Sequence, residues 1–138
     1  MKVANVMTSN VRVVSPTQTI REAAELMFKE NIGALPVGEQ DRLVGMITDR
    51  DIAIRGIGQG KGPDTKVHEV MSKEIKYCFE DEDLDHVSKN MADIQMRRLP
   101  VMNREKRLVG ILSLGDLATK RARAQAGRAL HGISQPAH

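Results

Sequence analysis

Aromatic residues and cysteine are scarce in this sequence. Its 138 residues include no tryptophan, one tyrosine (Tyr77) and two phenylalanines, so aromatic residues amount to 2%. This composition argues against a fold that stacks nucleic acid bases on aromatic rings. The single cysteine, Cys78, excludes an internal disulfide and is typical of a reducing compartment.

Long hydrophobic runs are also missing. No apolar stretch approaches the roughly 18 residues that a membrane-spanning helix needs, and the first residues lack the apolar region of a signal peptide. We therefore expect a cytoplasmic protein that does not enter a membrane.

Acidic residues are absent from the last part of the chain. The net charge is +3, and residues 120–138 contain Lys120, Arg121, Arg123 and Arg128 without any aspartate or glutamate. A basic tail can bind nucleic acid, but a solvated, partly disordered extension is the simpler interpretation. The rest of the chain gives no reason to expect nucleic acid binding.

What the sequence does contain is an internal repeat. The segment VANVMT aligns with VHEVMS, the first LPV with the second, and the first LVG with the second. Asp51 then aligns with Asp116. Matches that recur in the same order along the chain indicate a duplicated unit.

Each copy has the pattern of a β-α-β-β-α unit, which predicts an α+β fold. A short β run, VRVV or IKYCF, precedes a helix, and two strands joined by a turn precede a second helix. Thr19 and Glu22 form a capping box for the first helix, and Asp83 is placed to cap its counterpart. Gly33 is suited to end the first helix.

The repeat divides the chain into four parts. We expect repeats at 1–56 and 66–119, packed about a pseudo-two-fold axis, with a Gly-rich linker at 57–65 and the basic tail at 120–138. The linker glycines do not form a P-loop, because Gly62 stands after Lys61 where that loop needs serine or threonine.

A hydroxyl and an acid recur where the last strand of each copy meets the last helix. Thr48 and Asp51 stand in GMITDRD, and Ser113 and Asp116 stand in GILSLGD. Such a pair can be a capping box, which is a purely structural role. It can also bind a nucleotide, because a carboxylate accepts from ribose hydroxyls and the preceding glycine lets a ligand come close. The residues alone leave both interpretations open.

These motifs together resemble a tandem pair of CBS domains, also called a Bateman module. V-M-[TS], L-P-V and G-h-h-[TS]-x-x-D (h, apolar) each occur twice, in order, over residues 3–119. GALP and DRLVGMITDRDI are also similar to stand-alone CBS proteins of the hypoxic response protein type. The resemblance implies a homodimer that binds AMP, ADP or ATP in the cleft between the repeats. S-adenosylmethionine would fit an arginine-lined site less well.

The resemblance also implies which residues bind the nucleotide. Ribose and phosphate would contact Thr48, Arg50, Asp51, Arg97, Arg98, Ser113 and Asp116. The adenine pocket would be formed by Val11, Val13, Ala34, Pro36, Ile75, Tyr77 and Pro100.

No catalytic or metal-binding constellation is recognisable. The histidines have no metal-ligand spacing with Cys78 or with one another. We therefore expect a non-enzymatic sensor or regulatory module, active in energy sensing, that binds an adenosine nucleotide and acts on an unknown partner protein. The alternative is an oligomeric protein-interaction scaffold with vestigial nucleotide sites.

Overall fold

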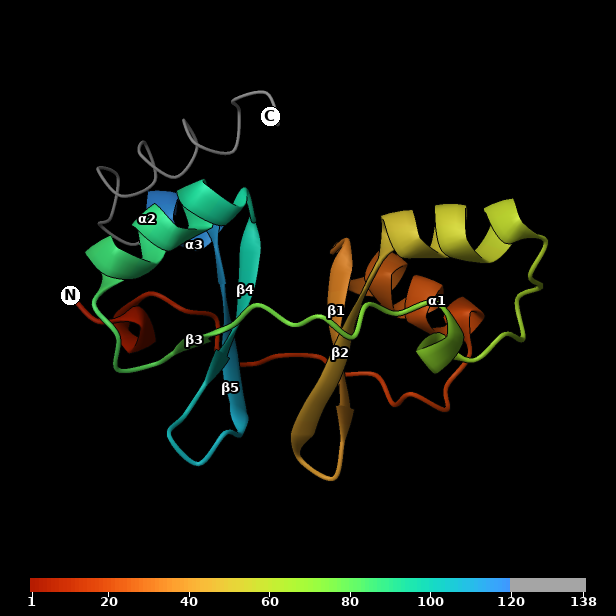
Figure 1. Cartoon of the computed structure of the whole chain (residues 1–138), viewed down its shortest axis with the longest axis horizontal. Helices are drawn as coiled ribbons and strands as arrows, with labels where there is room; N and C mark the ends of the chain where they lie inside the picture. The colour runs from red at the N-terminus through yellow and green to blue at the C-terminus, as the bar shows by residue number, and fades with distance from the viewer. Residues whose placement is uncertain (120–138) are drawn as a thin grey trace. The chain divides into compact units, whose positions relative to one another are not determined.

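The computed structural model describes residues 1–119, so the predicted basic tail at 120–138 lies outside the described residues. The chain forms two compact units (Figure 1). Within the described residues, unit 1 consists of Met1–Val11 and 76–119, and unit 2 consists of Arg12–Ile75. Each unit combines helices with a small sheet, which confirms the predicted α+β fold. The pseudo-two-fold axis stays a prediction.

Both units share the order helix, two strands, helical segment, and unit 1 has a short additional strand before its first helix. Unit 2 contains α1 (Ile20–Glu30), β1 (Ala34–Glu39), β2 (Arg42–Thr48) and a final helical segment, η2 (Asp51–Gly56). Unit 1 contains β3 (Cys78–Phe79), α2 (Leu84–Ile94), β4 (Arg98–Met102), β5 (Leu108–Ser113) and α3 (Leu114–Thr119). Short 3-10 turns complete them: η1 (Val3–Asn5), η3 (Ile57–Gln59) and η4 (Val67–Glu69). None of the helices in this described part is long and apolar enough to cross a bilayer.

The helix ends confirm one predicted cap and correct two others. Thr19 Oγ1 accepts a hydrogen bond from the Glu22 amide at 3.1 Å, and the Glu22 carboxylate accepts one from the Thr19 amide at 3.2 Å. Asp83 occupies the N-cap position of α2, but its side chain accepts no hydrogen bond that caps the helix. Helix α1 ends on Asn31, whose left-handed φ of 54° replaces the cap expected at Gly33.

Each unit contains an antiparallel hairpin, as the repeat predicts. β1 pairs with β2, and β4 pairs with β5. At the turn of the first hairpin, Gln40 and Asp41 have φ values of 52° and 63°. Two successive positive φ angles are typical of a type I′ turn, whose twist matches that of the flanking strands.

The predicted first strand of each copy is shorter than expected. Of IKYCF, only Cys78–Phe79 forms a strand, which pairs in parallel with β4. VRVV is reduced to a single parallel bridge between Val14 and Val37. The strand pairing in each unit therefore comes mainly from the hairpin.

The compact units differ from the sequence repeats at their N-terminal segments. In unit 1, Thr8 and Ile111 exchange two backbone hydrogen bonds of 2.9 Å, so the VMT segment lies along β5. In unit 2, Met46 and Ser72 exchange backbone hydrogen bonds of 3.0 and 2.8 Å, so the VMS segment lies along β2. Each repeat thus contributes its first segment to the sheet of the other repeat.

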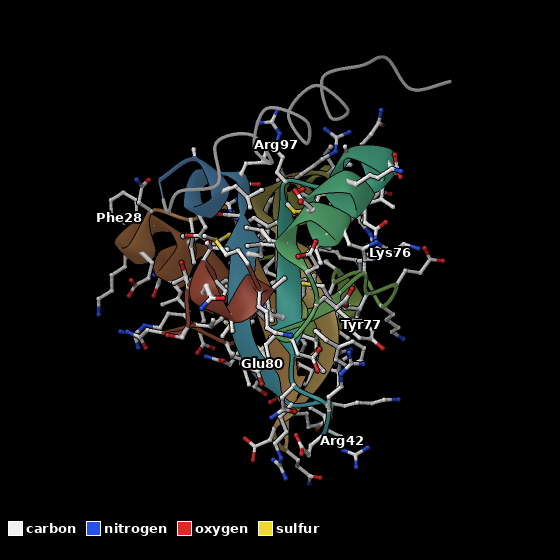
Figure 2. All side chains as sticks on the ribbon, turned by 90° about the vertical axis from the view of Figure 1, so that its left-hand side faces the viewer. Phe28, Arg42, Lys76, Tyr77, Glu80 and Arg97 are labelled. Carbon is white, nitrogen blue, oxygen red and sulfur yellow. The ribbon has the colours of Figure 1, made fainter. Side chains whose placement is uncertain are left out.

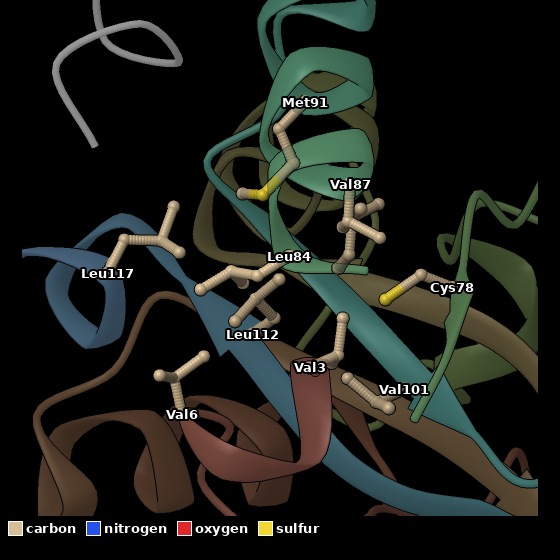
Figure 3. Close-up of a cluster of buried hydrophobic side chains, with 10 residues drawn as sticks. Val3, Val6, Cys78, Leu84, Val87, Met91, Val101, Leu112 and Leu117 are labelled. Atoms are coloured by element: carbon tan, nitrogen blue, oxygen red, sulfur yellow. The ribbon is translucent and has the colours of Figure 1, made fainter. Parts of the chain in front are cut away.

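Apolar burial holds these exchanged segments in place. Val3 and Val6 are 0% and 1% exposed in the core of unit 1, where they lie beside residues of the second repeat (Figure 3). Val67 and Val70 are equally buried in the core of unit 2. Full burial of one such side chain contributes about 1.5–3 kcal/mol, so each pair of valines supplies a substantial part of a typical folding free energy.

The buried Cys78 belongs to the core of unit 1, where Figure 3 shows its sulfur among valine and leucine side chains. Its side chain is 4% exposed, and burial raises the pKa of the thiol to about 12. The thiol is therefore protonated at neutral pH and acts as a small hydrophobic group.

The predicted linker packs back onto unit 2. The carbonyl oxygens of Thr65 and Pro63 accept hydrogen bonds from the amides of Ile20 and Arg21 at 2.8 and 3.3 Å, at the start of α1. Gly60 has a φ of 80°, which glycine adopts without strain. The Gly-rich composition here serves a turn that closes against a helix.

Candidate functional site

Both joints between strand and helix are reciprocal capping boxes. In unit 2, the Thr48 amide donates to Asp51 Oδ2 at 3.0 Å and the Asp51 amide donates to Thr48 Oγ1 at 3.1 Å. In unit 1, the Ser113 amide donates to Asp116 Oδ2 at 3.1 Å and the Asp116 amide donates to Ser113 Oγ at 3.2 Å. The structural interpretation of these motifs is therefore correct, and it engages only Oδ2 of each carboxylate.

The hairpin register brings one predicted adenine residue beside a predicted ribose residue. Ala34 lies directly opposite Thr48, and Pro36 lies opposite Met46. Because side chains alternate along a strand, these residues share the face opposite to that of Leu35, which points into the core. Ala34, Pro36 and Thr48 of unit 2 therefore lie on one face of the hairpin, where Pro36 is buried and the other two are half-buried.

Unit 1 repeats this arrangement with a cation. Arg98 lies directly opposite Ser113, at the position that Ala34 has in unit 2, and Pro100 lies opposite Ile111. Arg98 is exposed, and so are Arg97 and, in unit 2, Arg50. Figure 2 shows Arg97 extending away from the ribbon. The predicted phosphate-binding arginines are thus accessible within their own units.

In each unit, the residue after the last strand also forms a backbone hydrogen bond with the residue before the first strand of the hairpin. The Asp49 amide donates to the Gly33 carbonyl at 2.9 Å, and the Leu114 amide donates to the Arg97 carbonyl at 3.2 Å. A Cβ atom at Gly33 would stand 3.0 Å from Asp49 Oδ2. The exposed Asp49 side chain would have to shift to admit a side chain at residue 33.

The structure places the remaining predicted adenine residues in both units. Ile75 and Val13 belong to unit 2, and Val11 and Tyr77 belong to unit 1. Val13 and Tyr77 are each 43% exposed, whereas Ile75 and Val11 are half-buried. That these residues contact adenine stays a prediction.

Tyr77 belongs to a small aromatic and ionic cluster in unit 1. Its ring meets the ring of Phe79 edge to face at 5.6 Å, and Arg104 lies over Phe79 at 4.1 Å. Arg104 also donates to both carboxylate oxygens of Asp81, at 2.7 to 3.1 Å, and these hydrogen bonds lower the pKa of Asp81. This cluster joins β3 and the following Asp81 to the turn between β4 and β5, and it was not predicted.

The glycine before each joint has a different purpose from the one expected. A Cβ atom at Gly45 would stand 2.7 Å from Met71 Sδ and 2.8 Å from the Ser72 carbonyl oxygen. At Gly110 the corresponding distances, to Met7 and Thr8, are 2.6 and 2.9 Å. The absence of a side chain makes room for the exchanged segment, so the expectation that it makes room for a ligand is wrong.

The two carboxylates differ in what surrounds their second oxygen. Asp116 Oδ1 accepts a hydrogen bond from Thr8 Oγ1 at 3.0 Å. Asp51 Oδ1 faces Arg55 Nη1 at 3.8 Å, an ion pair beyond hydrogen-bond distance. Thr8 is a site residue that sequence reasoning missed. The repeated V-M-[TS] motif marked the position, but the partner of its hydroxyl depends on the exchange of segments.

A surface hollow of about 430 Å³ adjoins the joint of unit 2. It is lined by Arg55, His68, Glu69, Met71, Ser72, Lys73 and Glu74. Arg55 connects this hollow to the joint, because the same side chain pairs with Asp51. Within the described 119 residues, no three His, Cys, Asp or Glu side chains are grouped so that they could hold a metal ion.

Comparison with known proteins identifies the same motif in both repeats. Residues 3–56 and 67–123 each match the CBS domain family. Over 133 residues the chain is 49% identical to the CBS domain-containing protein YhcV of Bacillus subtilis, covering 96% of this chain and 94% of that protein.

Solved structures with the same fold include proteins with bound ligands. The Hypoxic Response Protein I structure, with two coordinated zinc ions, has 37% identity and a TM-score of 0.77, covering 86% of this chain and 97% of that one. CBSX2 in complex with AMP has 26% identity and a TM-score of 0.77, covering 92% and 98%. The CBS domain pair of MJ0100, in complex with 5-methylthioadenosine and S-adenosyl-L-methionine, has 29% identity and a TM-score of 0.77, covering 93% and 98%.

Proposed function

Because the chain belongs to the CBS-domain family and contains two copies of the domain, we propose that it is a non-enzymatic regulatory module that binds an adenosine nucleotide. The observation that carries this proposal is the pair of Thr/Asp and Ser/Asp joints, each with one carboxylate oxygen outside its capping box. Related CBS pairs with bound AMP or bound S-adenosylmethionine support it.

The proposed contacts follow the chemistry of each group. Asp51 and Asp116 accept hydrogen bonds from ribose hydroxyls, since an ionised carboxylate only accepts. Thr48 and Ser113 contact ribose or the first phosphate, and the arginines near each joint attract phosphate oxygens.

The adenine base contacts the apolar residues of the hairpins and of the first β segment of each copy. Ala34 and the buried Pro36 are apolar residues on the same hairpin face as Thr48 in unit 2. The remaining adenine contacts are Val11, Val13, Ile75, Tyr77 and Pro100. A ligand placed between the repeats, a homodimer, a cytoplasmic location and a role in energy sensing rest on the family resemblance alone.

Phosphate-bearing ligands suit this site better than a sulfonium ligand. Arg50 and Arg98 are exposed cations near the two joints, and they attract phosphates but repel the positive sulfur of S-adenosylmethionine. We therefore propose AMP, ADP or ATP as the ligand class.

A thermal-shift panel tests the proposal. The wild-type protein is melted with AMP, ADP, ATP or S-adenosylmethionine, beside an Asp51→Ala/Asp116→Ala double variant. A ligand present at 100 times its Kd stabilises the folded state by about 2.7 kcal/mol, which raises the melting temperature by several degrees. We expect this shift in the wild type and its loss in the double variant.

Thr19→Ala is the matched control. It removes a capping box of the same kind at α1, a different helix from those that follow the joints, so it lowers the melting temperature without removing a proposed ligand contact. It must keep the ligand-induced shift. Flat melting curves for the wild type with all four compounds would refute nucleotide binding and leave the scaffold as the better account.

A further inference from the structure

The two proposed sites are unequal because Thr8 already occupies one of the carboxylates. Asp116 accepts from the Ser113 amide through Oδ2 and from the Thr8 hydroxyl through Oδ1 at 3.0 Å. Both oxygens of this side chain therefore have a donor before any ligand arrives.

The equivalent residue in the other unit makes a different contact. Ser72 aligns with Thr8, but its hydroxyl donates to the Glu74 carbonyl at 3.4 Å. Among the described residues, no hydroxyl donates to Asp51 Oδ1, which faces only the guanidinium of Arg55 at 3.8 Å. The Asp51 side chain is 17% exposed, so solvent reaches it.

This difference determines which carboxylate can receive two vicinal hydroxyls. A ribose that donates to both oxygens of Asp116 must share Oδ1 with Thr8, whose hydrogen bond already uses part of the acceptor capacity of that oxygen. At Asp51 the ribose meets one oxygen without a donor, and Arg55 stands beside it to attract a phosphate.

We infer that Asp51 is the primary nucleotide-binding carboxylate and that Thr8 determines this preference by occupying Asp116. The inference rests on the proposed function and adds which site is filled first. Arg55 and Lys73 in the lining of the hollow can attract phosphates, whereas Glu69 and Glu74 in the same lining repel them. The chain therefore binds one nucleotide in its tighter site.

Isothermal titration calorimetry with AMP tests the inference directly. The wild type should bind one AMP per chain in the tighter site. Asp51→Asn, which keeps the shape of the side chain but removes its charge, should weaken that binding roughly 10- to 100-fold, as loss of a hydrogen bond to a charged group does. Asp116→Asn should weaken the weaker binding event and leave Asp51 as the site that fills first.

The Thr8 variants test the residue that sets the preference. Thr8→Val has nearly the shape of threonine but no hydroxyl, so it should release Asp116 and add a second binding event of comparable affinity. Thr8→Ser keeps the hydroxyl and is the matched control, which should retain one tight site. The bridge between Thr8 and Ile111 is formed by backbone atoms, so both variants keep it.

The outcomes separate the inference from the proposed function. Loss of tight AMP binding in Asp116→Asn but not in Asp51→Asn would overturn the inference while nucleotide binding stood. Two equal sites in the wild type, or no new site in Thr8→Val, would overturn it too. Absence of any AMP binding by the wild type, with flat melts for all four compounds, would refute the proposed function itself.

Discussion

Replacing Gly110 with alanine should weaken the attachment of the N-terminal segment to β5. A Cβ atom there would stand 2.6 Å from Met7 Sδ and 2.9 Å from the Thr8 carbonyl oxygen. The methionine side chain can move, but the carbonyl oxygen belongs to the bridge whose two hydrogen bonds to Ile111 measure 2.9 Å. The segment must therefore shift as a whole or lose these bonds.

The size of the effect follows from two contributions. Overpacking a well-filled site by one methyl group costs about 1–3 kcal/mol, and each weakened backbone hydrogen bond adds about 0.5–1.5 kcal/mol. We expect a loss of about 2–4 kcal/mol in the free energy of unfolding. For a domain of this size that lowers the melting temperature by roughly 8–15 °C.

Urea unfolding followed by circular dichroism measures this loss. Gly62→Ala is the control, because a Cβ atom at Gly62 meets nothing within 4 Å, and we expect its stability to stay within about 0.5 kcal/mol of the wild type. If Gly110→Ala unfolded at the same urea concentration as Gly62→Ala, the N-terminal segment could not lie against β5, and the exchange of segments would be refuted.

Three further predictions concern groups outside the joints. Thr19→Ala should lower the free energy of unfolding by about 1 kcal/mol because it removes a formed cap. Asp83→Ala should change this free energy much less, because the Asp83 side chain does not cap its helix. Urea denaturation of both variants measures the two losses, and equal losses would contradict the observed caps. Cys78, with its thiol pKa raised to about 12 by burial, should react with Ellman's reagent at pH 8 only after denaturation; rapid labelling of the native protein would show that the thiol is exposed. The Arg104 hydrogen bonds hold the pKa of Asp81 below its usual 3.8, so the stability that this ion pair contributes is present above pH 3.8 and is lost as the pH falls below it. The difference in melting temperature between wild type and Arg104→Gln should therefore shrink from pH 6 to pH 3. A constant difference would exclude the ion pair as its source.

Local signals in the sequence were sufficient for the order of elements. The apolar spacing and the Thr19 capping box predicted α1, and the LPV and LVG segments predicted each hairpin, because these features act between residues close in the chain. The internal repeat then predicted the same helix and hairpin for the second copy. Comparison with known proteins bears out the family resemblance that the same motifs carried.

Features that depend on packing between distant segments were not predicted. A repeat alignment shows that VMT and VMS are equivalent, but it does not show which sheet each one joins. The pairing of each segment with the sheet of the other repeat explains why glycine is needed at Gly45 and Gly110. It also brings the Thr8 hydroxyl within hydrogen-bond distance of Asp116. Asp83 shows a further limit, because a residue type that suits a cap need not orient its carboxylate toward the helix.

A crystal structure of the full chain grown with AMP tests the central claim most directly. The account predicts a ribose whose hydroxyls lie within hydrogen-bond distance of Asp51, while the Thr8 hydroxyl remains bonded to Asp116. AMP bound away from both joints, or a ribose on Asp116 with Asp51 unoccupied, would contradict it.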